Sequence, residues 1–267
     1  MTNGTPLLRV TALGISYVVD GVVYDVIAGV EFDAGAGEFI AIVGPSGVGK
    51  TSLVRCMAGL QKPTNGTIQL RGTAVQSGTP EGIAFVSQDY SRSLLPWMRI
   101  FDNIALPLKG KGIPVAEIAE RTTAALESVG LKDVGRKYPW QLSGGMQQRV
   151  SIARALAYHP ELLIMDEPFA SVDAQTRSEL EDLVIRLQHS TGVTIVLITH
   201  DIDSAVYMSD RVLVLGGRPA RITQEVVTGF GPERNQIDTK SLPAFLEHRA
   251  HVLRSVQHAQ RVLAADA

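Results

Sequence analysis

The feature that most constrains this chain is a glycine-rich segment that ends in lysine and threonine. It follows a short apolar run, Glu38–Val43, and precedes a helical pattern over Gly49–Ala58. The segment reads Gly44, Pro45, Ser46, Gly47, Val48, Gly49, Lys50, Thr51. It satisfies the phosphate-binding loop pattern at every constrained position, in the strand–loop–helix setting that this loop requires. The chain is therefore predicted to contain an α/β core that binds a nucleoside triphosphate.

Each part of this loop has a physical task. The glycines let backbone N–H groups converge on phosphate oxygens, and the following helix directs the positive end of its dipole at them. We expect Lys50 to contact the β- and γ-phosphates and the Thr51 hydroxyl to bind Mg²⁺, with Ser52 also among the nucleotide-binding residues. A dinucleotide-binding fingerprint is excluded, because its third glycine is missing after Gly49.

A second apolar run, Leu162–Met165, ends in two adjacent carboxylates, Asp166 and Glu167. An enzyme with a phosphate-binding loop needs an acid at such a strand end to hold Mg²⁺, and Asp166 fits this role. Neighbouring residues of an extended strand point to opposite sides, so the two carboxylates are predicted to have different roles. Glu167 is the candidate that orients or deprotonates the attacking water.

The order of elements predicts the fold class. Short β-rich runs alternate with longer helical patterns, which indicates a mostly parallel sheet with helical crossovers. Further strands are expected at 82–86, 193–198 and 211–215, and further helices at 115–129, 145–157, 175–188 and 202–208. Residues 89–160 are mostly helical in pattern and predict an inserted helical subdomain. We expect one domain over 1–230 and an amphipathic helical tail over 231–267, docked on that domain.

Composition excludes several classes of protein. The net charge of −2 argues against a generally basic protein that coats nucleic acid. A single cysteine, Cys56, excludes an internal disulfide and is expected to be a small buried apolar residue. The N-terminus lacks the pattern of a signal peptide, and no apolar run approaches the roughly 18 residues of a membrane span. We expect a soluble, cytosolic chain that contacts a membrane only peripherally.

The segment Leu142–Arg149 reads Leu-Ser-Gly-Gly-Met-Gln-Gln-Arg and resembles the signature of ATP-binding cassette (ABC) ATPases. By itself Ser143 would be an ordinary helix N-cap. The resemblance implies that Ser143, Gly144, Gly145 and Gln147 of one subunit close over the nucleotide of another. It thus implies a homodimer that sandwiches two ATP molecules with Mg²⁺. It also implies a P-loop NTPase core with an N-terminal antiparallel β subdomain and an inserted α-helical subdomain.

Three further polar residues match motifs of the same family. Gln88 resembles the loop glutamine that contacts Mg²⁺ and water and links the helical subdomain to the core. Asp173 lies in a segment that resembles the loop that crosses the dimer. His200 resembles the switch histidine that contacts the γ-phosphate. The resemblance therefore places Glu167, His200 and Gln88 in hydrolysis, and Thr51, Gln88 and Asp166 around the metal.

The residue that stacks on adenine has two candidates. Tyr17 resembles the aromatic residue that holds the base in the family, because it follows the first predicted strand. Tyr24 is the alternative, since Val18–Val23 has the pattern of a hairpin insertion. We favour Tyr17.

The resemblance implies an ATPase that powers solute import through a separate integral membrane permease, on the cytoplasmic side of the cell membrane. The segment Ser93–Arg99, which contains Trp97, is predicted to be an exposed patch that grips a partner helix; the alternative is a buried loop anchor. Leu94–Trp97 followed by Asp102–Ile104 resembles importers for nitrate, alkanesulfonates and taurine. An extracytoplasmic solute-binding protein would then be an indirect partner.

Two other classes remain as alternatives, a soluble ABC ATPase unlinked to transport and an importer ATPase for a different small solute. Repair-type ABC ATPases carry a very long coiled coil between the phosphate loop and the signature, whereas Lys50 and Ser143 are only 93 positions apart (143 − 50). We therefore expect no nucleic-acid partner. A GTP-binding switch is a separate class, and it would need a base-reading aspartate, which Thr239–Leu242 lacks.

Overall fold

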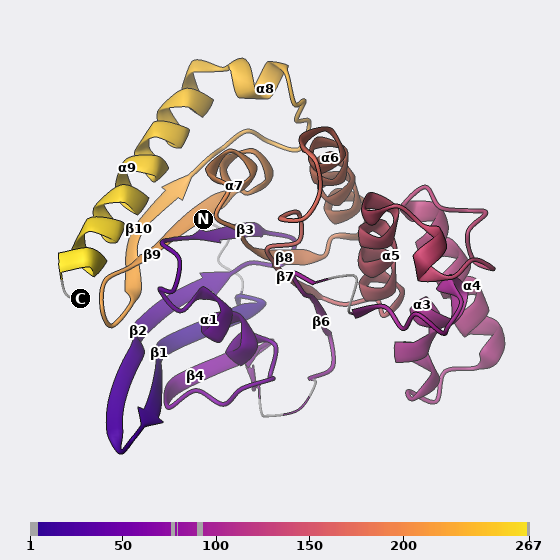
Figure 1. The fold of residues 1–267 in the computed structure, drawn as a ribbon, viewed down its shortest axis with the longest axis horizontal. Coiled ribbons are helices and arrows are strands. Elements are labelled where there is room, and N and C mark those ends of the chain that lie inside the picture. The colour runs from indigo at the N-terminus through magenta and orange to yellow at the C-terminus, as the bar shows by residue number, and fades with distance from the viewer. Residues whose placement is uncertain (1–4, 76–77, 79, 90–92, 266–267) are drawn as a thin grey trace.

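The computed structural model describes residues 5–75, 78, 80–89 and 93–265. Within these residues the strands form two sheets, with helices between and around them (Figure 1). The prediction about the N-terminus rests partly on residues 1–4, and the predicted helical insertion includes residues 90–92; both stretches lie outside the described residues. In the described part of the chain, no helix is both long and apolar enough to cross a membrane.

The smaller sheet is antiparallel, with the strand order β2-β1-β4-β5. Its strands are β1 (Leu8–Val19), β2 (Val22–Ala34), β4 (Asn65–Leu70) and β5 (Thr73–Ala74). The first two are joined by a two-residue turn, Asp20-Gly21, whose φ angles of 51° and 75° are those of the turn that suits the twist of a hairpin. The hairpin predicted at 18–23 and the antiparallel N-terminal subdomain are therefore confirmed.

The larger sheet has the order β10-β9-β3-β8-β7-β6, and its strands are parallel except for β10. The strands are β3 (Phe39–Val43), β6 (Ile83–Val86), β7 (Leu162–Asp166), β8 (Thr194–Ile198), β9 (Arg211–Gly216) and β10 (Arg221–Val227). Strands β3, β7 and β8 are buried along their whole length, as expected of parallel strands covered on both faces. The five strands predicted for this sheet are confirmed to within one residue at each end.

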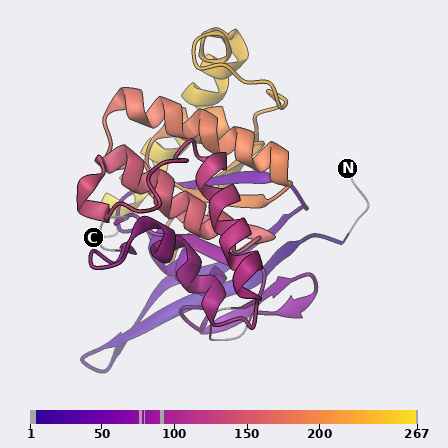
Figure 2. The ribbon, with the colours of Figure 1, turned by 90° about the vertical axis from the view of Figure 1, so that its right-hand side faces the viewer.

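The helices divide the core in two. Helix α1 (Lys50–Met57) packs between the sheets, where Cys56 is buried as predicted. The other face of the larger sheet is covered by α5 (Gly144–Ala157), α6 (Ala174–Thr191) and α7 (Ile202–Met208). Helices α3 (Ile100–Lys109) and α4 (Val115–Ser128) pack on α5 and stand out from the sheets as a helical subdomain at the right of Figure 1. In Figure 2 this subdomain faces the viewer, in front of the sheets.

The chain ends in the short helix α8 (Asp238–Ser241) and the long helix α9 (Pro243–Ala265). Helix α9 runs along β9, β10 and α7 at the edge of the larger sheet (Figure 1). Phe245, Val252 and Ala259 are its buried residues, and their spacing of seven puts them on one face of the helix.

Candidate functional site

The candidate site lies where four neighbouring parallel strands end. The phosphate-binding loop follows β3, His200 follows β8, Asp166 ends β7, and Gln88 follows β6. Because β3, β8, β7 and β6 are adjacent and parallel, their carboxyl ends share one edge of the sheet, where ligands bind in such folds. A cavity of about 460 Å³ opens there, lined by Tyr17, Val26, Ser46, Gly47, Gly49, Lys50, Thr51, Ser52, Gln88, Asp166, Glu167 and His200.

The phosphate-binding loop takes a conformation that depends on glycine. Gly49 precedes α1 with a φ of 108°, and a Cβ atom there would lie 2.9 Å from Cγ1 of Val26. Gly44, Pro45 and Val48 are buried and support the loop instead of lining the cavity. The remaining six predicted residues from 46 to 52 line it.

Lys50 extends across the loop. Its Nζ donates hydrogen bonds to the carbonyl oxygens of Gly44 at 2.8 Å and Pro45 at 2.9 Å. Burial lowers the pKa of Lys50, and the negative charges of Glu167 and Asp166 partly offset this effect. The Lys50 ammonium group therefore interacts electrostatically with the carboxylates of both Asp166 and Glu167.

The two carboxylates line the same cavity, so the alternation of side chains from which their different roles are predicted does not extend to Glu167. Asp166 is the last residue of β7, and Glu167 leaves the strand with a φ of 48°, so the alternation of an extended chain ends between them. Burial raises the pKa of the Asp166 carboxyl, and the charge of Glu167 raises it further, whereas Lys50 and a hydrogen bond with Thr51 act in the opposite direction.

Glu167 and His200 form a close pair. Nδ1 of His200 lies 2.7 Å from Oε2 of Glu167. The Glu167 side chain is 14% exposed, whereas that of His200 is 67% exposed. Glu167 is therefore held from one side by a histidine that faces the open part of the cavity.

Both candidate aromatic residues flank the phosphate loop. The Tyr17 hydroxyl lies 2.9 Å from Oγ of Ser52 and also contacts Gln61, a partner that no sequence motif indicates. Tyr24 is paired with Tyr17 across the hairpin and lines a neighbouring cavity of about 560 Å³. Val26 and Ser46 line both cavities.

The residues of the signature segment lie apart from this cavity. Ser143 caps α5 by accepting a hydrogen bond from the Met146 N–H at 3.4 Å, and it is exposed together with Gly144. Gly145 packs so closely on α6 that a Cβ atom would lie 2.5 Å from Cγ2 of Thr176. These residues therefore present an open helix N-terminus to the outside of the chain.

Gln147 and Asp173 also lie outside the cavity. The Gln147 amide donates to the carbonyl oxygens of Pro139 at 3.1 Å and Leu142 at 3.2 Å, which fixes the loop ahead of α5. Asp173 caps α6 by accepting hydrogen bonds from the N–H and hydroxyl of Thr176. Within the described residues, neither side chain is hydrogen-bonded to the phosphate-binding loop of its own chain.

Comparisons with known proteins agree with this arrangement. Residues 27–170 match the family described as ABC transporter. An uncharacterized ABC transporter ATP-binding protein of Methanocaldococcus jannaschii is 43% identical over 81% of this chain and 78% of its own length. A protein of Pseudomonas putida named taurine import ATP-binding protein is 38% identical over 91% of this chain and 93% of its own.

Solved structures show the same fold. An ATP-binding cassette in a dimeric, post-hydrolysis state bound to ADP and phosphate superimposes with a TM-score of 0.73 at 28% identity, covering 83% of this chain and 98% of that one. CbiO1 of Clostridium perfringens, part of an ABC transporter complex, has a TM-score of 0.76 at 29% identity, covering 84% and 90%. This chain belongs to the ABC transporter family, as one of its ATP-hydrolysing cassettes.

Proposed function

We propose that this chain powers the import of a small anionic solute of the nitrate, sulfonate or taurine class through a separate membrane permease. The ATPase activity is supported by one observation: the phosphate-binding loop, Asp166, Glu167 and His200 all line the same cavity. The import part rests on the relatives that are named taurine import ATP-binding proteins. The chain would act as a homodimer at the cytoplasmic side of the membrane, with an extracytoplasmic solute-binding protein as an indirect partner.

The residues around Lys50 fit Mg²⁺ as well as ATP. The Thr51 hydroxyl bonds to the buried Asp166 carboxylate, and Gln88 lines the same cavity. A hydroxyl, a carboxylate and an amide carbonyl are hard oxygen ligands of the kind that Mg²⁺ prefers. When bound, the ion would neutralise charge on the phosphates. Lys50 would bind the phosphates, and Glu167, oriented by His200, would direct and deprotonate the attacking water.

The site would be completed by a second copy of the chain. Ser143 and Gly144 expose a helix N-terminus away from the cavity, where it can meet the phosphates bound by another subunit. Asp173 begins the neighbouring helix and would lie on the path between the two sites. The dimeric relative bound to ADP and phosphate supports this arrangement.

The base-binding role of Tyr17 can be separated from that of Tyr24. We expect Tyr17→Ala to weaken ATP binding by about 1–3 kcal/mol, the range for stacking of a base on an aromatic ring, which corresponds to roughly 5–150-fold in Kd. Calorimetric titration with ATP measures this change. Tyr24→Ala is the matched control and should bind normally; the opposite result would assign the base to Tyr24.

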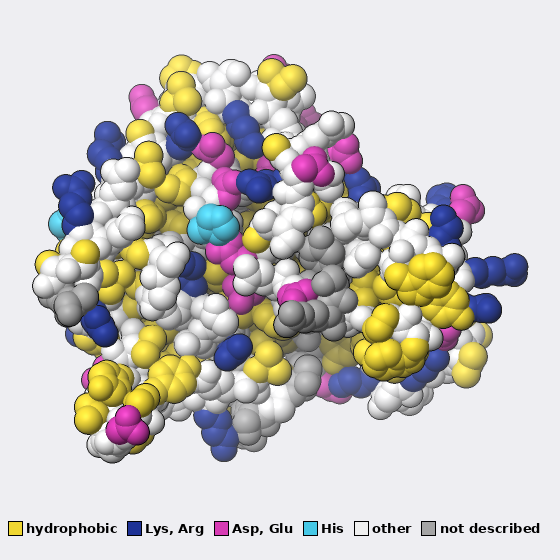
Figure 3. Space-filling view, in the orientation of Figure 1, with side chains coloured by type: hydrophobic (Ala, Val, Ile, Leu, Met, Phe, Trp, Pro, Cys, Tyr) yellow, Lys and Arg dark blue, Asp and Glu magenta, His cyan; other side chains and the backbone are white. Residues whose placement is uncertain are grey.

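Trp97 is exposed, so the alternative of a buried anchor is wrong for this residue, whereas Leu94 of the same segment is buried. Trp97 is 72% exposed, and hydrophobic side chains gather over the helical subdomain at the right of Figure 3. The segment that carries Trp97 is held from within by the buried Asn103 side chain, which bonds to Leu95 and Met98. The patch is therefore a rigid apolar surface suited to a partner helix.

We expect Trp97→Ala to leave ATP binding unchanged and to weaken binding to the permease by about 2 kcal/mol or more, roughly 30-fold. The reason is that truncation removes exposed apolar surface from a residue that does not line the nucleotide cavity. Affinity for the permease in detergent, measured with and without the substitution, is the test. Val227→Ala, at an exposed apolar position of β10 outside the helical subdomain, serves as the control; loss of ATP binding in Trp97→Ala would show that Trp97 supports the fold.

The solute class is tested with the complete transporter in liposomes. ATP-dependent uptake of taurine, an alkanesulfonate or nitrate is the expected result. Uptake of an unrelated solute by the same complex would leave the ATPase assignment intact and overturn the solute class.

A further inference from the structure

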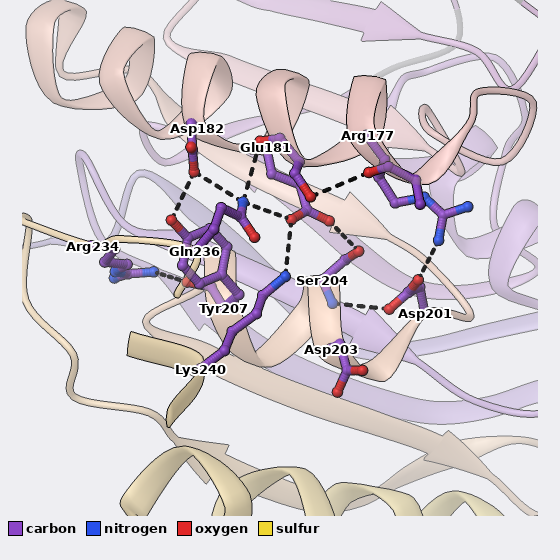
Figure 4. A network of polar contacts seen from close by, with 12 residues as sticks. Arg177, Glu181, Asp182, Asp201, Asp203, Ser204, Tyr207, Arg234, Gln236 and Lys240 are labelled. Carbon is purple, nitrogen blue, oxygen red and sulfur yellow. Dashed lines mark hydrogen bonds and ion pairs between the residues drawn. The ribbon is translucent and has the colours of Figure 1, made fainter. Parts of the chain in front are cut away.

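After β10 the chain crosses back over α6 and α7 and binds to both helices (Figure 4). We call residues 234–240 the strap. The strap begins with Arg234, whose side chain is only 2% exposed. Its guanidinium donates to the carbonyl oxygens of Tyr207 at 2.9 Å and Ser209 at 3.2 Å, and it pairs with Asp210 at 2.7 Å. Arg234 thus anchors the strap to the end of α7.

Two other strap residues bind acidic groups of α6. Nε2 of Gln236 lies within hydrogen-bonding distance of Glu181 Oε2 at 3.0 Å and Asp182 Oδ1 at 2.9 Å. Nζ of Lys240 lies 3.4 Å from Glu181 Oε2. Glu181 is 1% exposed, and a buried carboxylate is costly unless it is paired and hydrogen-bonded. The strap therefore supplies the donor and the cation that this buried carboxylate needs.

Glu181 in turn connects α6 to α7 close to the candidate site. Its Oε1 accepts a hydrogen bond from the Ser204 hydroxyl, and the Ser204 N–H donates to Asp201 Oδ1 at 2.9 Å. Asp201 also pairs with Arg177 of α6 at 2.6 Å. Asp201, labelled in Figure 4, directly follows His200. These contacts therefore hold the backbone from which His200 reaches Glu167.

The two helices begin at functional loops. Helix α6 starts directly after Asp173, and α7 starts directly after Asp201. A shift of α6 against α7 near these N-termini can therefore move Asp173 relative to His200. The phosphate-binding loop and α1 pack on the other face of the sheet. In the described part of the chain, no hydrogen bond or ion pair joins them to the strap.

We infer that Gln236 and Lys240 are positioning residues for ATP hydrolysis. By neutralising and bonding Glu181, they hold α6 and α7 in the packing that keeps His200 on Glu167 and Asp173 at the dimer surface. The inference rests on the proposed roles of His200 and Asp173. The strap therefore affects the rate of ATP hydrolysis and does not affect the affinity for nucleotide.

Steady-state kinetics of the full-length protein test this inference. Gln236→Met keeps the length of the side chain and removes its amide donors, and Lys240→Met removes the cation. We expect each substitution to lower kcat by about 10- to 100-fold, because a displacement of about 1 Å at a catalytic group can cost roughly 10²-fold. The Kd for ATP should stay within about twofold of wild type, because no phosphate-binding group is moved.

Three further variants separate positioning from general stability. Arg254→Met changes an exposed residue of α9 that has no hydrogen bond or ion pair with the described residues, and it should keep the wild-type kcat. Lys240→Arg retains the charge and should restore most of the kcat lost in Lys240→Met. The pair Glu181→Gln with Lys240→Met removes both charges and should recover thermal stability without full recovery of kcat.

The outcomes are distinct. Wild-type kcat in both Gln236→Met and Lys240→Met would overturn the inference. It would also be overturned if both variants lost ATP affinity in parallel with kcat, or if kcat fell only in proportion to the folded fraction measured by circular dichroism. Absence of ATP hydrolysis in the wild-type protein and in Arg254→Met would instead overturn the proposed roles of His200 and Glu167, on which the inference rests.

Discussion

Glu167→Gln is expected to bind ATP as the wild-type protein does and to hydrolyse it about 10²–10⁴-fold more slowly, the range for loss of general-base catalysis. The amide keeps the shape of the carboxyl group and one oxygen that can accept a hydrogen bond. It removes the negative charge and the basicity that the attacking water requires. The 2.7 Å contact with Nδ1 of His200 can persist, because the amide oxygen can take the place of Oε2.

Phosphate release and ATP titration, measured on the same preparation, check this prediction. Glu120→Gln makes the same chemical change at an exposed position of α4 and should behave as wild type. Hydrolysis by Glu167→Gln at the wild-type rate would show that another group activates the water. Loss of ATP binding would show that Glu167 contributes to the nucleotide site itself.

Lys50→Ala is expected to abolish measurable ATP binding and hydrolysis. Nζ of Lys50 is held over the phosphate loop by two carbonyl oxygens, at 2.8 and 2.9 Å, and can transfer to phosphate oxygens without a large movement. A hydrogen bond to a charged group contributes about 1.5–3 kcal/mol, so loss of contacts to two phosphates raises Kd by roughly 10²–10⁴-fold.

Equilibrium binding of a fluorescent ATP analogue measures this change. Lys62→Ala, at an exposed position after α1, is the control for the loss of one positive charge. Undiminished hydrolysis by Lys50→Ala would contradict the assignment of the phosphate-binding loop.

The parts of the fold that the sequence predicts are those in which local pattern and burial coincide. Strands β3, β7 and β8 are continuous apolar runs because both of their faces are covered, and their ends carry the site residues. Helix α1 is predicted because the phosphate-binding loop pattern requires a helix directly after it. Parallel strands with helical crossovers then place the loop and Asp166 at one edge of the sheet.

Other parts depend on contacts that local pattern does not encode. Helix α3 contains Pro107 and the buried Asn103, both of which weaken a helical signal. The sequence pattern does not predict strands β4, β5 and β10 individually. The turn of Glu167 into the cavity arises from a backbone angle after β7, and periodicity carries no information about it. The strap joins residues about 55 positions apart through single polar contacts, such as that between Gln236 and Glu181.

The dimer that shares its nucleotides is tested most directly by the mass of Glu167→Gln in solution, measured by light scattering with and without Mg²⁺ and ATP. Because hydrolysis is stalled, bound ATP should bridge the phosphate loop of one chain and Ser143 of the other. The expected result is one chain per particle without ATP and two with it. Ser143→Arg in the same background should bind ATP and remain a single chain. Glu167→Gln that stays a single chain when saturated with ATP would contradict the shared site.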